Sequence, residues 1–220
     1  MTSNYLTVAA VTATIARQVS EALAQIPAPS KSPVIRYGLS ERDPAFVGCT
    51  IVLYRLNASP FRRNDAVPAR NHEGAFVQKP RVAVEADYLF AFSGDEATLE
   101  PHRFLGAVVS AFNAQPFLSF AAMRHTIQDT PYLSGLAGAD QAEHIRLRQR
   151  DVDDETLSRV WGLFPGIPYQ LSAFYTASPL TIEAEVTPVA IPPVSEVQLS
   201  IEWNRPRVPG LDPTIEIERT

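Results

Sequence analysis

The sequence lacks the features that define several large classes of protein. Cys49 is its single cysteine, so a disulfide framework within the chain is excluded, and this usage fits a reducing compartment. No apolar run approaches the ~20 residues of a membrane span, and no basic and apolar signal pattern follows Met1. The formal net charge of -5 gives no support for wholesale nucleic-acid binding. We therefore expect neither a membrane span nor a nucleic-acid partner.

Motifs for catalysis and cofactor binding are missing as well. The 10 glycines are scattered and form no phosphate-binding loop, and no serine lies in a nucleophile-elbow pattern. The spacing of the four histidines matches no metal-ligand motif (His72, His102, His125 and His144). The sequence predicts a protein that is not an enzyme and that holds no cofactor or metal.

The segment from Pro80 to Phe117 is the organising stretch, and it predicts a strand, a turn and a helix. Even positions of the strand 82–92 are apolar, whereas the odd positions include Glu85 and Asp87. Alternate side chains of a strand point to opposite faces, so one face should be core and the other partly polar. Pro101 suits the first turn of the helix that follows. An apolar stripe should place that helix on the strand (Leu105, Val108, Val109 and Phe112).

Two further elements precede this segment. Residues 6–26 carry an apolar stripe at helical spacing and end at Pro27 and Pro29, which predicts an amphipathic helix. This helix should pack on a sheet or a neighbouring helix, although docking on a partner protein stays open. Residues 49–57 carry apolar residues on both faces of a predicted strand, as expected of a central strand that is covered on two sides. Cys49 should be a small core residue in it.

The connection from Ala58 to Lys79 is long, has no periodicity and carries an excess of basic residues. Two interpretations are open: a solvated loop, or a basic arm that reaches an acidic surface on another subunit. The second interpretation makes four residues candidates for an interface with a subunit or a tube (Arg62, Arg63, Arg70 and Lys79).

The pattern weakens between Leu118 and Arg150, where residues 145–148 predict a short strand. Acidic residues 153–155 before an apolar stripe predict a short helix. Residues 169–176 and 180–186 both alternate like strands, and the short connection means that they pair or run on into one another.

The C-terminal part has 2 predicted strands on proline-rich tethers, residues 197–203 and 214–218. In the first of these, four apolar residues alternate with polar ones (Val197, Leu199, Ile201 and Trp203). Such strands either close the sheet of their own domain or add to the edge of a neighbour's sheet. We take the second possibility as the hypothesis and count these four residues as interface candidates.

The fold expected from these elements is α/β. A mixed twisted sheet is flanked by an N-terminal helix and a central helix, with proline-rich arms. Residues 1–190 should form the α/β domain, and residues 191–220 a proline-tethered C-terminal strand or arm. Glu85 and Asp87 share a strand face, as a pair of acid/base carboxylates would. Pairing of these acids with Arg55, Arg62 or Arg63 is the simpler interpretation.

The order of these elements resembles a known family. The strand Val-Gly-Cys-Thr-Ile-Val-Leu-Tyr-Arg-Leu-Asn (47–57) precedes an Arg-Arg-Asn loop and the strand Pro-Arg-Val-Ala-Val-Glu-Ala-Asp-Tyr-Leu-Phe-Ala-Phe (80–92). Glu-Pro-His-Arg-Phe-Leu-Gly-Ala-Val-Val (100–109) and Leu-Ser-Arg-Val-Trp-Gly-Leu-Phe-Pro-Gly (157–166) follow. Over residues 6–190 this pattern is similar to the cap, or tail-terminator, proteins of extracellular contractile injection systems, which are phage-tail-like particles.

The resemblance implies a structural role. Family members form a ring, expected to be a hexamer, at the end of the inner tube distal to the baseplate, where the ring stops tube growth and joins the sheath. Its partners would be further copies of itself, the inner tube and the sheath. The protein would be in the bacterial cytoplasm during assembly and afterwards at the distal end of the particle.

Two alternatives remain at this point. The first is another structural component of the tail, such as a baseplate protein or a tube–sheath adaptor. The second is a small enzyme or ligand-binding domain, whose site would combine Glu85, Asp87 and His102. A pocket that holds these three side chains together would support it.

Overall fold

The computed structural model describes residues 4–38, 43, 45–59, 81–136 and 145–183. Six strands form one sheet of order β1-β2-β3-β6-β5-β4, in which β1 runs parallel to β2 and the other neighbours are antiparallel. The strands are β1 Val34–Tyr37, β2 Gly48–Ala58, β3 Arg81–Ser93, β4 Phe117–Leu118, β5 Ile145–Gln149 and β6 Ser172–Glu183. The helices are α1 Thr7–Ala24, α2 Glu100–Ala114, α3 Phe120–Asp129 and α4 Asp154–Trp161. The predicted α/β class with a mixed sheet, an N-terminal helix and a central helix is confirmed.

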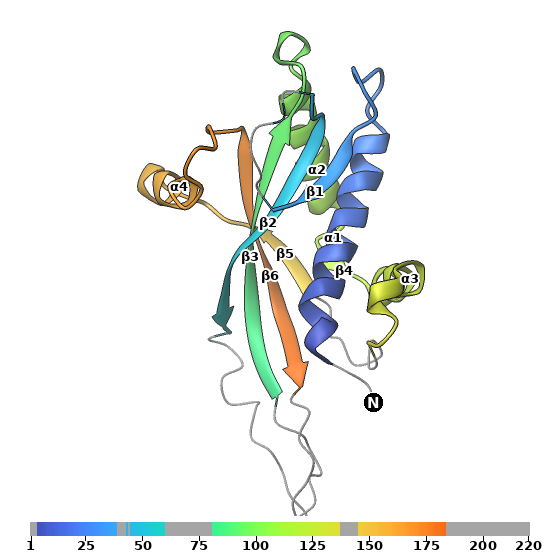
Figure 1. Cartoon of the computed structure of the whole chain (residues 1–220). Coiled ribbons are helices and arrows are strands. Elements are labelled where there is room, and N and C mark those ends of the chain that lie inside the picture. The colour runs from blue at the N-terminus through green and yellow to red at the C-terminus, as the bar shows by residue number, and fades with distance from the viewer. Residues whose placement is uncertain (1–3, 39–42, 44, 60–80, 137–144, 184–220) are drawn as a thin grey trace, which may run out of the picture.

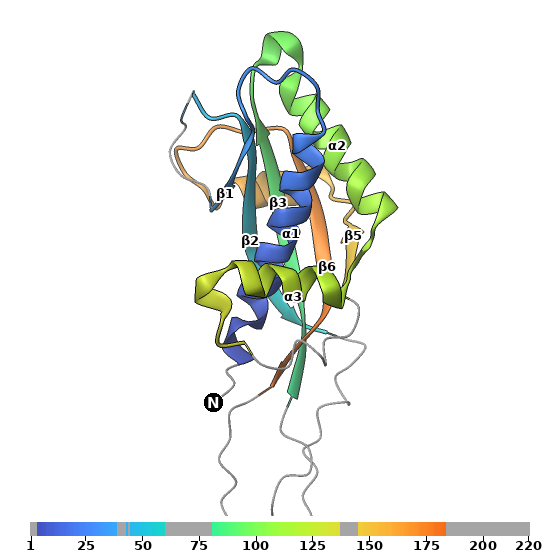
Figure 2. The same cartoon turned by 90° about the vertical axis from the view of Figure 1, so that its right-hand side faces the viewer.

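Three helices, α1, α2 and α3, cover one face of the sheet, which we call the helix face (Figures 1 and 2). The even residues of β3 lie there, and Phe90 is fully buried at the centre. Its ring centroid is 5.5 Å from those of Phe112 on α2 and Tyr175 on β6, both in edge-to-face geometry. This aromatic cluster confirms the predicted packing of the strand 82–92 on the central helix.

Helix α1 follows from its apolar spacing, as predicted. Val11, Ile15 and Val19 are fully buried against the sheet, and the Thr12 hydroxyl lies 2.8 Å from the Tyr88 hydroxyl on β3. The helix ends one turn before Pro29, with the backbone N–H of Gln25 bonded to Ala22. Its apolar stripe is therefore part of this domain's own core.

Among the described residues, α4 is the helix that packs on the opposite face of the sheet, and it covers part of that face (Figure 1). Trp161 of α4 packs in a cluster with Leu89 and Ala91 of β3 and Phe174 of β6. The odd face of the strand 82–92 is partly polar, as predicted, but Leu89 and Ala91 on it form a second apolar cluster because a short helix far along the chain covers them.

A bulge changes the character of β2 halfway along the strand. Leu53 pairs with Tyr88 and Arg55 pairs with Asp87, so Tyr54 is one extra residue, and the side chains beyond it change faces. The first half of β2 is buried and the second half is largely exposed. The prediction of a strand covered on two sides holds only before the bulge. Gly48 begins the strand at φ +139°, and a Cβ there would lie 2.1 Å from the Val34 carbonyl oxygen of β1.

Helix α2 begins at Glu100, whose buried carboxylate accepts hydrogen bonds from two loops, one at Ser30 and one at Asp95. The carboxylate accepts from the backbone N–H of Asp95 at 2.7 Å, from the Ser30 hydroxyl at 2.8 Å and from the Ser30 N–H. Burial opposes ionisation, but these donors together hold the pKa of Glu100 below its usual value. Phe104, Val108 and Phe112 form the buried stripe of α2, whereas Leu105 and Val109 of the predicted stripe are half-buried.

Several shorter elements complete the described part. The predicted strand at 145–148 and the helix after Asp153 are confirmed as β5 and α4, and residues 172–183 run on as the single strand β6. Helix α3 and strands β1 and β4 were missed by the sequence analysis. Among the described residues, no helix combines the length and the apolar character that a membrane crossing requires.

Candidate functional site

The interface residues predicted from the sequence lie outside the described residues. Arg62, Arg63, Arg70 and Lys79 belong to the segment 60–80, and Val197, Leu199, Ile201 and Trp203 to the segment 184–220. Both segments leave the described part at one end of the sheet, because Arg81 at the start of β3 pairs with Glu183 at the end of β6. The eight residues stay candidates, and the described surface beside them offers a separate set.

A row of polar side chains crosses the sheet below α4, on the face opposite the three helices. Strand pairing aligns Arg55 of β2 with Asp87 of β3, Asp87 with Thr176 of β6, and Thr176 with Arg148 of β5. Residues directly opposite one another in antiparallel strands share a face. Four strands thus place an acid, a hydroxyl and two guanidinium groups side by side.

Asp87 is the buried centre of this row, with only 3% of its side chain exposed. Its Oδ2 accepts from Arg55 Nε at 2.7 Å and Asn57 Nδ2 at 3.1 Å, and its Oδ1 accepts from the Thr176 hydroxyl at 2.6 Å. Arg150 Nη1 lies 2.9 Å from the same Oδ2. A carboxylate with this many donors is held in one orientation, which is a structural role.

Two partly exposed guanidinium groups therefore share one carboxylate. The Arg55 side chain is 50% exposed and that of Arg150 is 30% exposed. Arg150 Nη1 also donates to the Tyr54 hydroxyl at 3.2 Å, and burial raises the pKa of that phenol. The Arg55 guanidinium is therefore anchored through Nε, and half of its side chain stays open to solvent.

Strand β5 adds two more arginines to the same face. Arg146 and Arg148 are exposed and alternate with the buried Ile145 and Leu147. The Arg146 guanidinium lies 5.7 Å from the ring centroid of Phe117 on β4. We call the set Arg55, Arg146, Arg148 and Arg150 the arginine face. The sequence analysis missed it, although arginine at every second position from 146 to 150 was the available signal.

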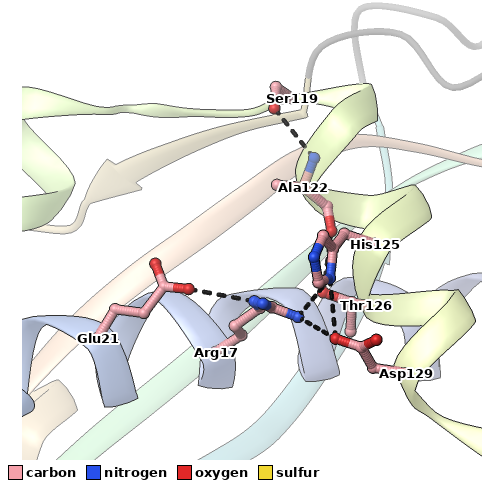
Figure 3. A network of polar contacts seen from close by, with 7 residues as sticks. All are labelled: Arg17, Glu21, Ser119, Ala122, His125, Thr126 and Asp129. Carbon is pink, nitrogen blue, oxygen red and sulfur yellow. Dashed lines mark hydrogen bonds and ion pairs between the residues drawn. The ribbon is translucent and has the colours of Figure 1, made fainter.

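A second polar network joins α1 to α3 on the other side of the molecule (Figure 3). Arg17 reaches Glu21 at 3.1 Å and Asp129 Oδ2 at 2.7 Å, and its Nη1 is 2.9 Å from His125 Nδ1. His125 Nδ1 also lies 2.8 Å from Asp129 Oδ2. The hydrogen bond between Arg17 and Asp129 raises the pKa of the Arg17 guanidinium and lowers the pKa of the Asp129 carboxyl.

The protonation of His125 decides which of its two contacts is a hydrogen bond. A bare Nδ1 accepts from Arg17, whereas a protonated Nδ1 donates to Asp129. All of these side chains are partly exposed, so water screens the charges. The network holds α3 against α1.

The enzyme alternative fails on geometry. Asp87 lies under the arginine face, whereas His102 is exposed on α2, which covers the helix face. The proposed trio of Glu85, Asp87 and His102 therefore does not meet, and the pairing of Asp87 with Arg55 is confirmed. Among the described residues, no three His, Cys, Asp or Glu side chains gather where they could hold a metal ion.

Cys49 is a core residue, as predicted. It is fully buried at the start of β2 in the cluster on the helix face. Burial raises the pKa of its thiol far above the usual value, because the thiolate would have to form in an apolar environment. A thiol in this state is unreactive.

The chain was compared with known protein families and solved structures. The family model described as Pvc16 N-terminal domain matches residues 10–196. None of the curated proteins matches the chain.

Two solved structures share the fold. One is the sheath/tube terminator of an extracellular contractile injection system, PVC, in the extended state, with a TM-score of 0.57 and 15% identity over 90% of this chain. The other is the tube-terminating cap of the anti-feeding prophage, with a TM-score of 0.53 and 14% identity over 84% of this chain. The matched part amounts to 64% and 59% of those two chains, so this chain spans less than two thirds of either.

Proposed function

The chain belongs to the Pvc16 N-terminal domain family, and on that premise we propose that it terminates the inner tube of a contractile injection system. The match over residues 10–196 carries this proposal, since it covers nearly all of the described fold. The likeness to a sheath/tube terminator and to a tube-terminating cap supports the same role. These two neighbours are structural proteins, and together with the family match they confirm the expectation that this chain is not an enzyme.

In the proposed particle, copies of the chain form a ring, expected to be a hexamer, at the end distal to the baseplate. The ring stops tube growth and joins the sheath. A ring brings one patch of each copy against a different patch of the next, so a subunit needs at least two dissimilar contact surfaces. The chain assembles in the bacterial cytoplasm and is afterwards part of the finished particle.

Within this proposal the chain has two parts. Residues 1–190 are the α/β domain, and residues 191–220 are an arm that contacts a neighbouring subunit or the sheath. The basic residues of the segment 60–80 and the apolar residues of the segment 197–203 are interface residues (Arg62, Arg63, Arg70, Lys79, Val197, Leu199, Ile201 and Trp203).

The test is removal of the chain from the particle. Particles produced without it should have tubes of irregular length and an unjoined sheath end, as seen in electron micrographs. Supplying the chain again should restore one uniform length. Uniform, closed particles in its absence would contradict the terminator role. Loss of the baseplate instead would favour the alternative of a baseplate or adaptor protein.

A further inference from the structure

The arginine face carries more guanidinium groups than carboxylates. Arg55 and Arg150 share the single carboxylate of Asp87. Arg146 and Arg148 are exposed and form no ion pair with a carboxylate of the described residues. Within the described part of the chain, no helix covers this half of the sheet on the α4 side (Figure 1). An excess of fixed positive charge on an open surface is complementary to an acidic partner.

The spacing of the arginines indicates how the acidic groups of the partner should be spaced. Arg146 and Arg148 are alternate residues of β5, so they are about 7 Å apart, and Arg150 follows directly after the strand. An extended segment with carboxylates at alternate positions has the same repeat. Each carboxylate then meets one guanidinium group, with the planar N–H fork of arginine suited to the two oxygens.

The chain itself contains a segment of this kind. In Thr214–Glu218, Glu216 and Glu218 alternate with Ile215 and Ile217. We propose that the arginine face of one copy binds the segment 214–218 of a neighbouring copy, with Glu216 and Glu218 opposite the arginines of β5. The inference rests on the self-assembly in the proposed function. It specifies one pair of surfaces through which neighbouring copies would make contact.

The length of the connection favours a neighbouring copy over the chain's own segment. Residues 184–213 separate β6 from the segment, and six of these 30 residues are proline. A connection of that length spans up to about 90 Å when fully extended. Strand β6, with 12 residues, is only about 40 Å long. A spacer that overshoots its own sheet so far is suited to a contact with the next subunit.

Thiol cross-linking of the full chain tests the contact. Arg148→Cys in one preparation is mixed with Glu216→Cys in another and treated with a short bismaleimide, because an arginine–glutamate pair separates its Cα atoms by more than a disulfide spans. The products are separated by denaturing electrophoresis. Cys49 is fully buried and gives a silent background. The matched control is Arg124→Cys, an exposed arginine on α3 and thus on the helix face. We expect a cross-linked dimer with Arg148→Cys, several-fold less with Arg124→Cys, and a yield that falls as salt is added.

Charge exchange provides the second readout, by sedimentation. Arg146→Glu with Arg148→Glu should weaken self-association about tenfold or more, and so should Glu216→Arg with Glu218→Arg. Combining all four changes should restore it.

Equal cross-linking at positions 124 and 148, no cross-linking at all, or no restoration by the fourfold variant would overturn the inference. So would a cross-link that forms only within one chain in the double variant Arg148→Cys with Glu216→Cys. Because these measurements use the purified chain, they can fail while the terminator role stands, and the particle experiment can fail while they succeed.

Discussion

The two faces of β3 are built from alternate residues of one strand and have opposite characters. Tyr88, Phe90 and Phe92 point to the helix face and are buried in an aromatic core. Leu89 and Ala91 on the opposite face are covered by α4. Asp87, the next residue on that face toward the start of β3, is held by arginines that are partly open to solvent. We infer that stability rests on the helix face, while the exposed arginines are available for the contact proposed above. Changes on the helix face should unfold the domain, whereas changes at the exposed arginines should leave it folded.

The largest expected effect is at the centre of the helix face. Phe90→Ala removes a fully buried ring that contacts two other rings, and should lower the free energy of unfolding by about 3–5 kcal/mol. Urea unfolding followed by circular dichroism measures it. A loss below about 1 kcal/mol would show that this face is not the core.

A smaller effect is expected at Asp87, the buried centre of the polar row. Asp87→Asn keeps the size of the side chain but removes the charge that two guanidinium groups share, and should cost about 1–3 kcal/mol. The loss stays below the cost of breaking a fully buried pair because water reaches both arginines. Arg148→Ala is the matched control on the same row and should unfold like the unaltered chain. Equal losses in the two variants would contradict the separation of roles.

Glu100 gives a pH dependence with a definite sign. Its pKa is lowered in the folded chain, so its contribution is complete above the ordinary glutamate value of about 4.3 and is lost as the pH falls through the lower, folded value. The free energy of unfolding should therefore drop on acidification below about pH 4. Glu100→Gln should flatten that part of the profile, measured by urea unfolding at a series of pH values. An unchanged slope would show that the donors at Asp95 and Ser30 do not stabilise the carboxylate.

The smallest effect is expected at the network between α1 and α3. Arg17→Ala removes contacts with Glu21, His125 and Asp129 that are all partly exposed. Exposed pairs contribute little, because water and salt screen them. Thermal unfolding should be indistinguishable from that of the unaltered chain at physiological salt. A clear loss of stability would mean that this network, unlike the arginines of β5, belongs with the core.

The sequence predicted those elements whose periodicity is long enough to identify a face. Helix α1 has several turns of apolar residues, and β3 has a run of apolar residues at even positions from Val84 onward; both faces were assigned correctly to the core. Helix α3 was missed because Met123 and Thr126 are its only buried residues, which is too few to form a stripe. Strands β1 and β4 have four and two residues, and such short strands carry no pattern of their own.

The arginine face depends on information that is not local. Arginine recurs at positions 146, 148 and 150, but only the pairing of β5 with β6, and of β6 with β3, places them beside Asp87. The bulge at Tyr54 also moves Arg55 to the face opposite Leu53, although both are odd-numbered residues of the same strand. An alternating pattern read along the sequence cannot include a bulge, because the extra residue is defined by the partner strand.

The most direct test of the account is the position of the chain on assembled particles. The chain would carry a small tag bound to a gold label, and labelled particles would be imaged by electron microscopy. The account predicts gold at one end only, where the inner tube and sheath finish away from the baseplate. Gold at the baseplate, along the sheath, or on no part of the particle would contradict it.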